Sequence, residues 1–144
     1  MSAPRSEHAP RMTATETNRA LIAKAFAGLE RGDPSDFLPL FAEDIEWRVM
    51  GSSAWSKHER GLADVERKLV GPLLARISGP YRNIPELILA DGDHVVVLAR
   101  GDAETVEGGR YDNDYCFVFR MAGGRIVEVR EYLDTILADR ALGR

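Results

Sequence analysis

The sequence predicts an α+β fold, in which a cone-shaped, curved antiparallel or mixed sheet packs against N-terminal helices. Near the N-terminus, apolar residues recur at helical spacing, which is typical of amphipathic helices. After Gly79-Pro80 the apolar pattern changes to alternation, which is typical of strands with one buried face. Glycine-containing turns separate four such segments, as expected of an antiparallel meander.

The N-terminal part predicts two helices. Thr13 and Glu16 match a capping box, in which each side chain satisfies a free backbone N–H of the other residue. Apolar residues between 21 and 29 follow at helical spacing, and Gly32 ends this helix. Asp33-Pro34 predicts the start of a second, short helix, because aspartate favours the cap and proline the first helical position.

A strand, a loop and an interrupted helix are predicted next. Residues 44–51 alternate between apolar and charged, as in a half-buried strand, and residues 51–61 predict a loop. Residues 62–77 carry one apolar helical stripe. Gly71-Pro72 predicts a kink or break near Val70, because proline lacks an N–H donor and clashes with the preceding turn.

Four strands are predicted after the interrupted helix. Pro85 places the first of them at a sheet edge or a bulge, because proline cannot donate a ladder hydrogen bond. Asp91-Gly92 predicts a tight hairpin turn after that strand. The expected strands cover residues 81–90, 93–106, 110–121 and 125–135, and a short helix through Ile136 closes the chain.

The composition indicates one domain, over residues 13–144, behind a disordered leader at residues 1–12. A net charge of −4 gives no electrostatic footprint for nucleic acid, and no apolar run is long enough for a membrane span. Cys116 is the only cysteine, which excludes an internal disulfide and fits a cytoplasmic location. The histidines lack metal-ligand spacing and no dinucleotide or phosphate motif is present, so we expect neither a metal nor a cofactor.

The order of elements and three motifs resemble the NTF2-like superfamily, specifically its SnoaL-like and ketosteroid-isomerase-like branch. The motifs are LFAEDIEW at residues 40–47, the GGRY turn at 108–111 and GGRIVEVREYLDT at 123–135. The resemblance covers about residues 13–142 and implies an isomerase, cyclase, dehydratase, epoxide hydrolase or binding protein. Ketosteroid isomerases carry an aspartate base where this chain has Val49-Met50-Gly51, and a tyrosine where it has Ala25-Phe26, so their mechanism is not expected here.

The chain also resembles limonene-epoxide-hydrolase-like enzymes. These carry Arg-x-Asp on a central strand and a second acid on the last strand. The resemblance places Arg100, Asp102 and Glu131 at those positions. It implies that one acid protonates the epoxide oxygen, the other activates water, and the arginine holds both. Trp47 and Val49 stand where that family has a tyrosine and an asparagine that hold the water.

Strand alternation predicts the lining of a pocket beneath the sheet. If Leu98 faces the cavity, Arg100 and Asp102 face it too, because alternate residues of a strand share a face. On the last strand, Glu131 shares its face with Leu133. The other expected substrate contacts are Asn113, Tyr115 and Phe117 on the strand between, and Trp47 as an apolar wall.

These residues predict cofactor-free acid–base chemistry on an apolar small molecule. Asp102 and Glu131 would carry protons with different pKa values, and Arg100 would organise them. Tyr115 and Asn113 would donate hydrogen bonds to an oxyanion. On this interpretation, Asp102→Asn would abolish turnover.

Structural interpretations of the same residues stay open. Arg100 and Asp102 could form an ion pair on the surface. Glu131 could pair with a neighbouring arginine on the surface, and Tyr115 could be a core residue whose hydroxyl is hydrogen-bonded. The alternative function is a non-catalytic ligand-binding or dimerisation module of the same fold. The second face of the sheet is expected to be rich in Val and Phe, which predicts a homodimer through it.

Overall fold

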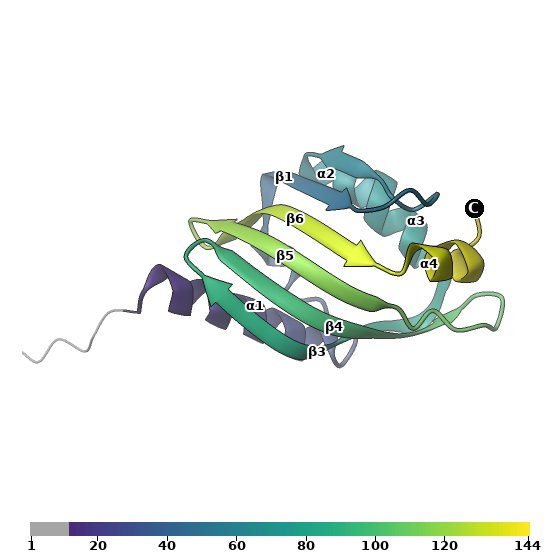
Figure 1. The fold of residues 1–144 in the computed structure, drawn as a ribbon, viewed down its shortest axis with the longest axis horizontal. Coiled ribbons are helices and arrows are strands. Elements are labelled where there is room, and N and C mark those ends of the chain that lie inside the picture. The colour runs from purple at the N-terminus through teal and green to yellow at the C-terminus, as the bar shows by residue number, and fades with distance from the viewer. Residues whose placement is uncertain (1–11) are drawn as a thin grey trace, which may run out of the picture.

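The computed structural model describes residues 12–144, so the predicted leader lies outside the described residues except for Met12. The predicted α+β class is confirmed, because helices pack on one six-stranded sheet (Figure 1). Helix α1 (Ala14–Leu29) begins after Thr13, whose Oγ1 accepts a hydrogen bond from the Glu16 backbone N–H at 3.1 Å. This is the first half of the predicted capping box.

The sheet consists of a meander and two added strands. Its strands are β1 (Phe41–Val49), β2 (His58–Arg60), β3 (Ile77–Asp91), β4 (His94–Thr105), β5 (Asp114–Ala122) and β6 (Arg125–Leu133). They lie in the order β2-β1-β6-β5-β4-β3, with β1 parallel to β6 and all other pairs antiparallel. Pro85 lies on the edge strand β3 beside a register shift, so the prediction of an edge or bulge is confirmed.

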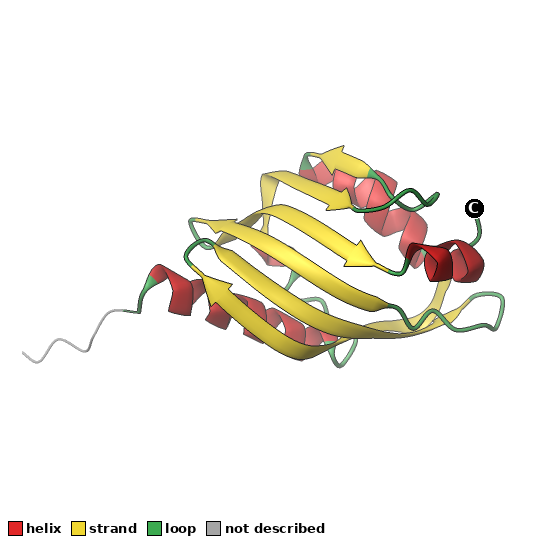
Figure 2. Ribbon diagram, in the orientation of Figure 1, coloured by secondary structure: helices red, strands yellow, loops and turns green. Residues whose placement is uncertain are grey.

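The helices that precede β3 lie on one face of the sheet, and the last helix lies at the end of the sheet beyond β6 (Figure 2). Helix α1 lies against β3 and β4, and α2 (Leu62–Val65) lies against β1. A π-helical turn over Glu66–Val70 leads directly into α3 (Gly71–Leu74), and the backbone stays helical at Val70 and Gly71, so the helix has a local change of winding where the sequence predicts a kink or break. The last helix is α4 (Thr135–Leu142). Within residues 12–144, no helix combines the length and apolar character needed to cross a bilayer.

Aromatic side chains join α1 to the inner face of the sheet. Phe26 of α1 is fully buried, and its ring centroid lies 5.8 Å from that of Phe117 and 5.9 Å from that of Phe119. Phe37, in the loop after α1, packs edge-on against Phe26 with the centroids 5.9 Å apart. Such edge-to-face contacts add directional preference to apolar burial. They hold the helix at a fixed distance above β5.

The predicted direction of the β4 side chains is wrong. Leu98 is 41% exposed and Arg100 is exposed on the open face, and Asp102 lies on the same face. The inward residues are small and apolar: Val95, Val97, Ala99, Gly101 and Ala103. Small residues leave room for the aromatic rings beneath them, whereas buried charges need partners there. The residues of this strand that carry charge therefore face away from the helices.

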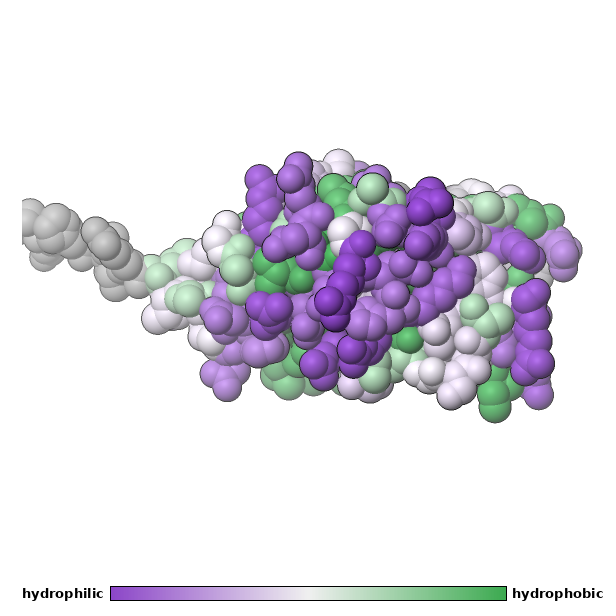
Figure 3. Space-filling view, turned by 90° about the horizontal axis from the view of Figure 1, so that it is seen from above, coloured by the Kyte–Doolittle hydropathy of each residue, from purple (hydrophilic) through white to green (hydrophobic). Residues whose placement is uncertain are grey.

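Residues 58–60 form the edge strand β2 rather than the predicted loop. They pair antiparallel with β1. On the outer side, Glu46 binds His58 at 2.5 Å and Arg60 at 3.6 Å. The surface seen from the side of β1 and β2 is largely hydrophilic (Figure 3). A short, charged edge strand resists pairing with another sheet.

Candidate active site

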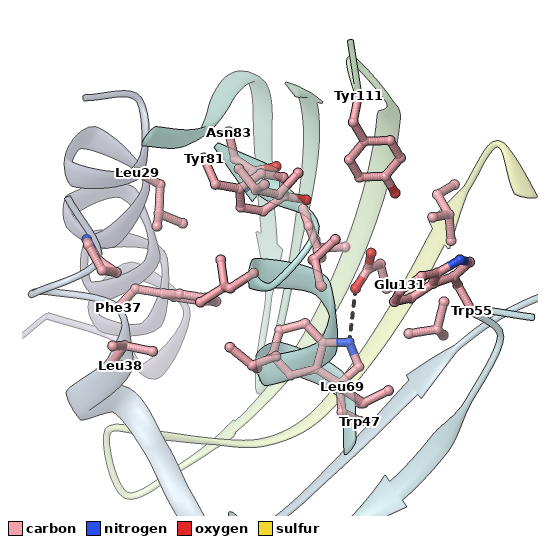
Figure 4. Close-up of a pocket in the computed structure, with 18 of the residues that line it drawn as sticks. Leu29, Phe37, Leu38, Trp47, Trp55, Leu69, Tyr81, Asn83, Tyr111 and Glu131 are labelled. Atoms are coloured by element: carbon pink, nitrogen blue, oxygen red, sulfur yellow. Dashed lines mark hydrogen bonds between the residues drawn. The ribbon is translucent and has the colours of Figure 1, made fainter. Parts of the chain in front are cut away.

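A cavity of about 490 Å³ lies between the inner face of the sheet and the helices (Figure 4). Its wall is mostly apolar, with contributions from α1, β1, β6 and the helical segment 62–74. The ionisable side chains that reach it are Tyr81, Tyr111, Glu131, Lys57 and Lys68. Ligand sites commonly combine apolar walls with a few polar groups of this kind.

Among residues 12–144, Glu131 is the only carboxylate that lines this cavity. It points inward from β6 between Val49 of β1 and Phe117 of β5, so apolar neighbours flank it on both sides. Burial raises the pKa of Glu131 to about 7, although the Trp47 indole N–H donates to its Oε1 at 3.0 Å and lowers it. Near neutral pH the carboxyl therefore populates both forms, and it can accept or donate a proton.

Three tyrosines lie near Glu131. The hydroxyl oxygens of Tyr81 and Tyr115 are 2.5 Å apart, and the ring of Tyr111 stacks on that of Tyr81 with centroids 6.4 Å apart. Burial raises the pKa of each tyrosine, and the charge of Glu131 raises it further. All three hydroxyls therefore stay protonated at neutral pH.

Tyr111 is the tyrosine best placed to donate into the cavity. Asn113 Nδ2 donates to its hydroxyl at 3.3 Å, which leaves the Tyr111 proton available for another acceptor. Tyr111 and Glu131 point toward the same space in Figure 4. A carboxyl and a phenolic donor thus face one apolar cavity. Among residues 12–144, no three His, Cys, Asp or Glu side chains gather as a metal site would need.

The sequence profile of the SnoaL-like domain matches residues 22–129, which is most of the chain. The chain belongs to the SnoaL-like domain family. This SnoaL-like domain is 29% identical to an uncharacterized protein of Mycobacterium tuberculosis, Rv0034, over 112 residues that cover 78% of this chain and 85% of that protein.

Two solved structures show the same fold as this SnoaL-like domain. An NTF2-like protein of Burkholderia xenovorans is 27% identical, with a TM-score of 0.69 over 89% of this chain and 97% of that chain. A candidate SnoaL-like polyketide cyclase of Jannaschia is 15% identical, with a TM-score of 0.72 over 94% of this chain and 98% of that chain. The NTF2-like fold expected from the sequence is thereby confirmed.

The SnoaL-like domain brings only part of the predicted site together. The predicted residues that line the cavity are Glu131, Trp47, Phe117 and Leu133. Tyr115 points inward but lies behind Tyr81, to which its hydroxyl is bonded. Asn113 is fully buried, and its amide holds the backbone of Asp114 and Asp134, so its role in this structure is to fix the end of β6.

Arg100, Asp102 and Leu98 do not reach the cavity, which corrects the prediction that they line it. Asp102 instead forms a surface ion pair with Arg110 and lies 3.9 Å from Arg82. The two acids expected to meet in the cavity do not do so in the described residues. The side chains of β6 point in the predicted direction, whereas those of β4 point in the opposite one.

Asp102→Asn is therefore expected to leave any turnover unchanged. The Asp102 side chain is 41% exposed, and exposed ion pairs contribute at most about 1 kcal/mol. Thermal unfolding and an activity assay of the same preparation check this. Loss of activity in a folded Asp102→Asn protein would restore the interpretation made from the sequence.

Sequence reasoning missed Tyr81, Asn83 and Tyr111. The strand that carries Tyr81 and Asn83 starts at Ile77 rather than at residue 81. Counting alternate residues from Ile77 places both side chains on its buried side. Tyr111 belongs to the GGRY turn, where no strand period applies, so only the three-dimensional structure shows its direction.

Proposed function

We propose that this protein is an enzyme that transfers protons on an apolar small molecule, of the isomerase or cyclase type. The observation that carries the proposal is Glu131, the one carboxylate that the described residues place in an apolar cavity, whose pKa of about 7 suits acid and base roles alike. The single cysteine, Cys116, supports a cytoplasmic location.

The geometry supports a simple division of roles. In its charged form, Glu131 removes a proton from a carbon next to a carbonyl group and returns it to another carbon. Tyr111 donates a hydrogen bond to the carbonyl oxygen while negative charge develops there. Trp47 stabilises the carboxylate through the 3.0 Å hydrogen bond. The apolar wall excludes water from the reacting groups.

A single carboxyl favours isomerisation or cyclisation over epoxide hydrolysis. One group can take and return the same proton, whereas the hydrolysis implied by the sequence resemblance uses one acid on the leaving oxygen and a second on water. No second carboxylate lines the cavity within the described residues. The candidate polyketide cyclase with the same fold agrees with this choice.

Deuterium incorporation into an enolisable apolar ketone tests the proposal. β-Tetralone is incubated with the protein in deuterated water, and exchange is followed by proton NMR. We expect exchange above the buffer rate, and a loss of about a hundred-fold or more in Glu131→Gln. Equal rates for the wild-type protein and Glu131→Gln would contradict the role of Glu131. Binding of the ketone without any exchange would support a ligand-binding module instead.

We also propose that the open face of the sheet binds a second copy of the chain. Leu87, Leu98, Cys116 and Tyr132 form one cross-strand row, and the next row is Leu89, Val96 and Val118. Of the Val and Phe expected on this face, Val96 and Val118 lie on it, whereas Phe117 and Phe119 lie on the inner face, as the alternation of their strand predicts. Along β5 the outward residues run from Asp114 through the apolar pair to Arg120. A two-fold axis through the apolar rows would bring Arg120 near Asp114 of the partner subunit.

Leu98→Glu is expected to convert this dimer to monomer. The substitution puts a charge in the middle of the apolar row, where Leu98 is 41% exposed. Light scattering after size exclusion gives the mass of each protein. Ile136→Glu is the control, because Ile136 is 63% exposed on α4 and belongs to neither apolar row. A monomeric wild-type protein would refute the dimer.

A further inference from the structure

Asn83 carries a buried polar atom without a partner. Its side chain lies on β3, lines the cavity and is 5% exposed. Its Oδ1 has no hydrogen-bond partner, and it is the only such buried side-chain atom in residues 12–144. Buried amide oxygens in folded proteins almost always have a partner, so an orphan atom in a cavity wall calls for an explanation.

Other buried polar side chains in the described residues are satisfied. Asn113 bonds to the backbone of two residues and to Tyr111. Asn18 donates to the carbonyl oxygen of Gly92 at 3.1 Å. Thr105 accepts from the backbone N–H of Gly109 at 3.0 Å. The orphan at Asn83 is therefore specific to the cavity rather than a general property of this core.

Stability of the empty protein does not account for an asparagine at this position. The backbone of Asn83 pairs with Gly101 of β4, a contact that leucine would keep. Leucine has the same branching and number of side-chain heavy atoms, the adjoining cavity leaves room for its larger methyl groups, and it would remove the penalty of an unpaired acceptor. Asn83 does lie near the Tyr81 hydroxyl, whose pKa burial raises and the Asn83 amide partly lowers. Even so, Oδ1 has no hydrogen-bond partner.

We infer that the natural ligand of this cavity carries a hydroxyl or N–H group that donates to Asn83 Oδ1. An amide oxygen accepts and cannot donate, so a ketone, ether or carboxylate oxygen would gain nothing from it. The surrounding wall is apolar and aromatic, with Phe117 and the stacked pair Tyr81 and Tyr111 close by. The ligand class is an apolar alcohol, phenol or amine. The inference rests on the proposed use of the cavity as a small-molecule site, and not on catalysis.

A matched pair of probes tests the inference. β-Naphthol has a hydroxyl proton, and its methyl ether keeps the ring but has no donor. Calorimetry on the wild-type protein is expected to show about five- to ten-fold tighter binding of β-naphthol. In Asn83→Leu this preference should disappear, while the melting temperature of the free protein rises by about 2–4 °C.

Asn18→Leu is the control, because Asn18 is also buried, at 8% exposure, but is hydrogen-bonded and lies outside the cavity. It should lower the melting temperature and keep the preference for β-naphthol. Three results would overturn the inference: an unchanged preference in Asn83→Leu, a lower melting temperature of that variant, or no binding of either probe to the wild-type protein. Absence of deuterium exchange would refute the enzyme proposal alone, since these measurements do not involve turnover.

Discussion

Glu131→Gln is expected to make the folded protein more stable than the wild type at and above neutral pH. The folded state binds a proton at Glu131 up to a pKa of about 7, whereas the unfolded chain releases it near the usual value of 4.5. Between these values the folded state holds more protons, so the contribution of this group to stability falls as pH rises. The total change approaches about 3 kcal/mol and levels off above pH 7.

Urea unfolding at a series of pH values measures this effect. Glutamine keeps an oxygen that can accept the hydrogen bond of the Trp47 indole N–H. The variant therefore removes the titratable carboxyl and retains the shape of the side chain. The difference in free energy of unfolding between the two proteins should be small near pH 4.5 and largest above pH 7. Carboxyls with lowered pKa values, such as Glu46 and Asp112, cancel in this difference because both proteins contain them. A difference that does not change with pH would show that Glu131 has the same pKa in the folded and unfolded states.

Trp47→Phe is expected to raise the pKa of Glu131 and to move the pH dependence of deuterium exchange upward. The indole N–H is the hydrogen bond that favours the charged carboxylate against burial. Phenylalanine fills much of the same space and cannot donate. At neutral pH a smaller fraction of Glu131 is then the active base, so the exchange rate falls and recovers at higher pH.

Trp55→Phe is the control for this shift. Trp55 also lines the cavity, but its indole N–H donates to the carbonyl oxygen of Gly143 at 2.6 Å rather than to a carboxylate. The carboxyl resonance of Glu131 in an NMR titration should therefore move its midpoint in Trp47→Phe and not in Trp55→Phe. If the titration midpoint of Glu131 is the same in the wild type and both variants, Trp47 has no effect on the carboxyl and serves only as part of the cavity wall.

The sequence predicts the fold far better than the site. Alternation and glycine turns are local signals, and they place the meander, the Asp91-Gly92 hairpin and the edge position of Pro85 correctly. It is harder to predict which face of a strand points inward, because the strand over residues 94–105 has apolar residues on both faces. The inward face is distinguished by small residues rather than by strongly apolar ones, and Leu98 is exposed. The inward direction of Glu131 follows from the sequence because Val129 and Leu133 fix the inward face of β6.

Long-range partners were beyond sequence reasoning for a physical reason. The contact of Trp47 with Glu131 depends on the parallel pairing of β1 with β6, which no local pattern encodes. Tyr81 lies within β3, which begins earlier than the sequence indicates, and Tyr111 lies in the turn before β5, where no period of two applies. The site therefore depends on how distant strands pair and in which register, whereas the fold class depends on the local periodicity of apolar residues.

The parallel pairing of β1 with β6 has a consequence for biosynthesis. Trp47 and Glu131 are 84 positions apart, and β1 leaves the ribosome long before the strand that lies beside it. Until β6 is made, the nascent chain has an apolar strand with one unpaired edge, a form that tends to aggregate. The hydrogen bond between Trp47 and Glu131 therefore forms only after the last strand of the sheet has been made.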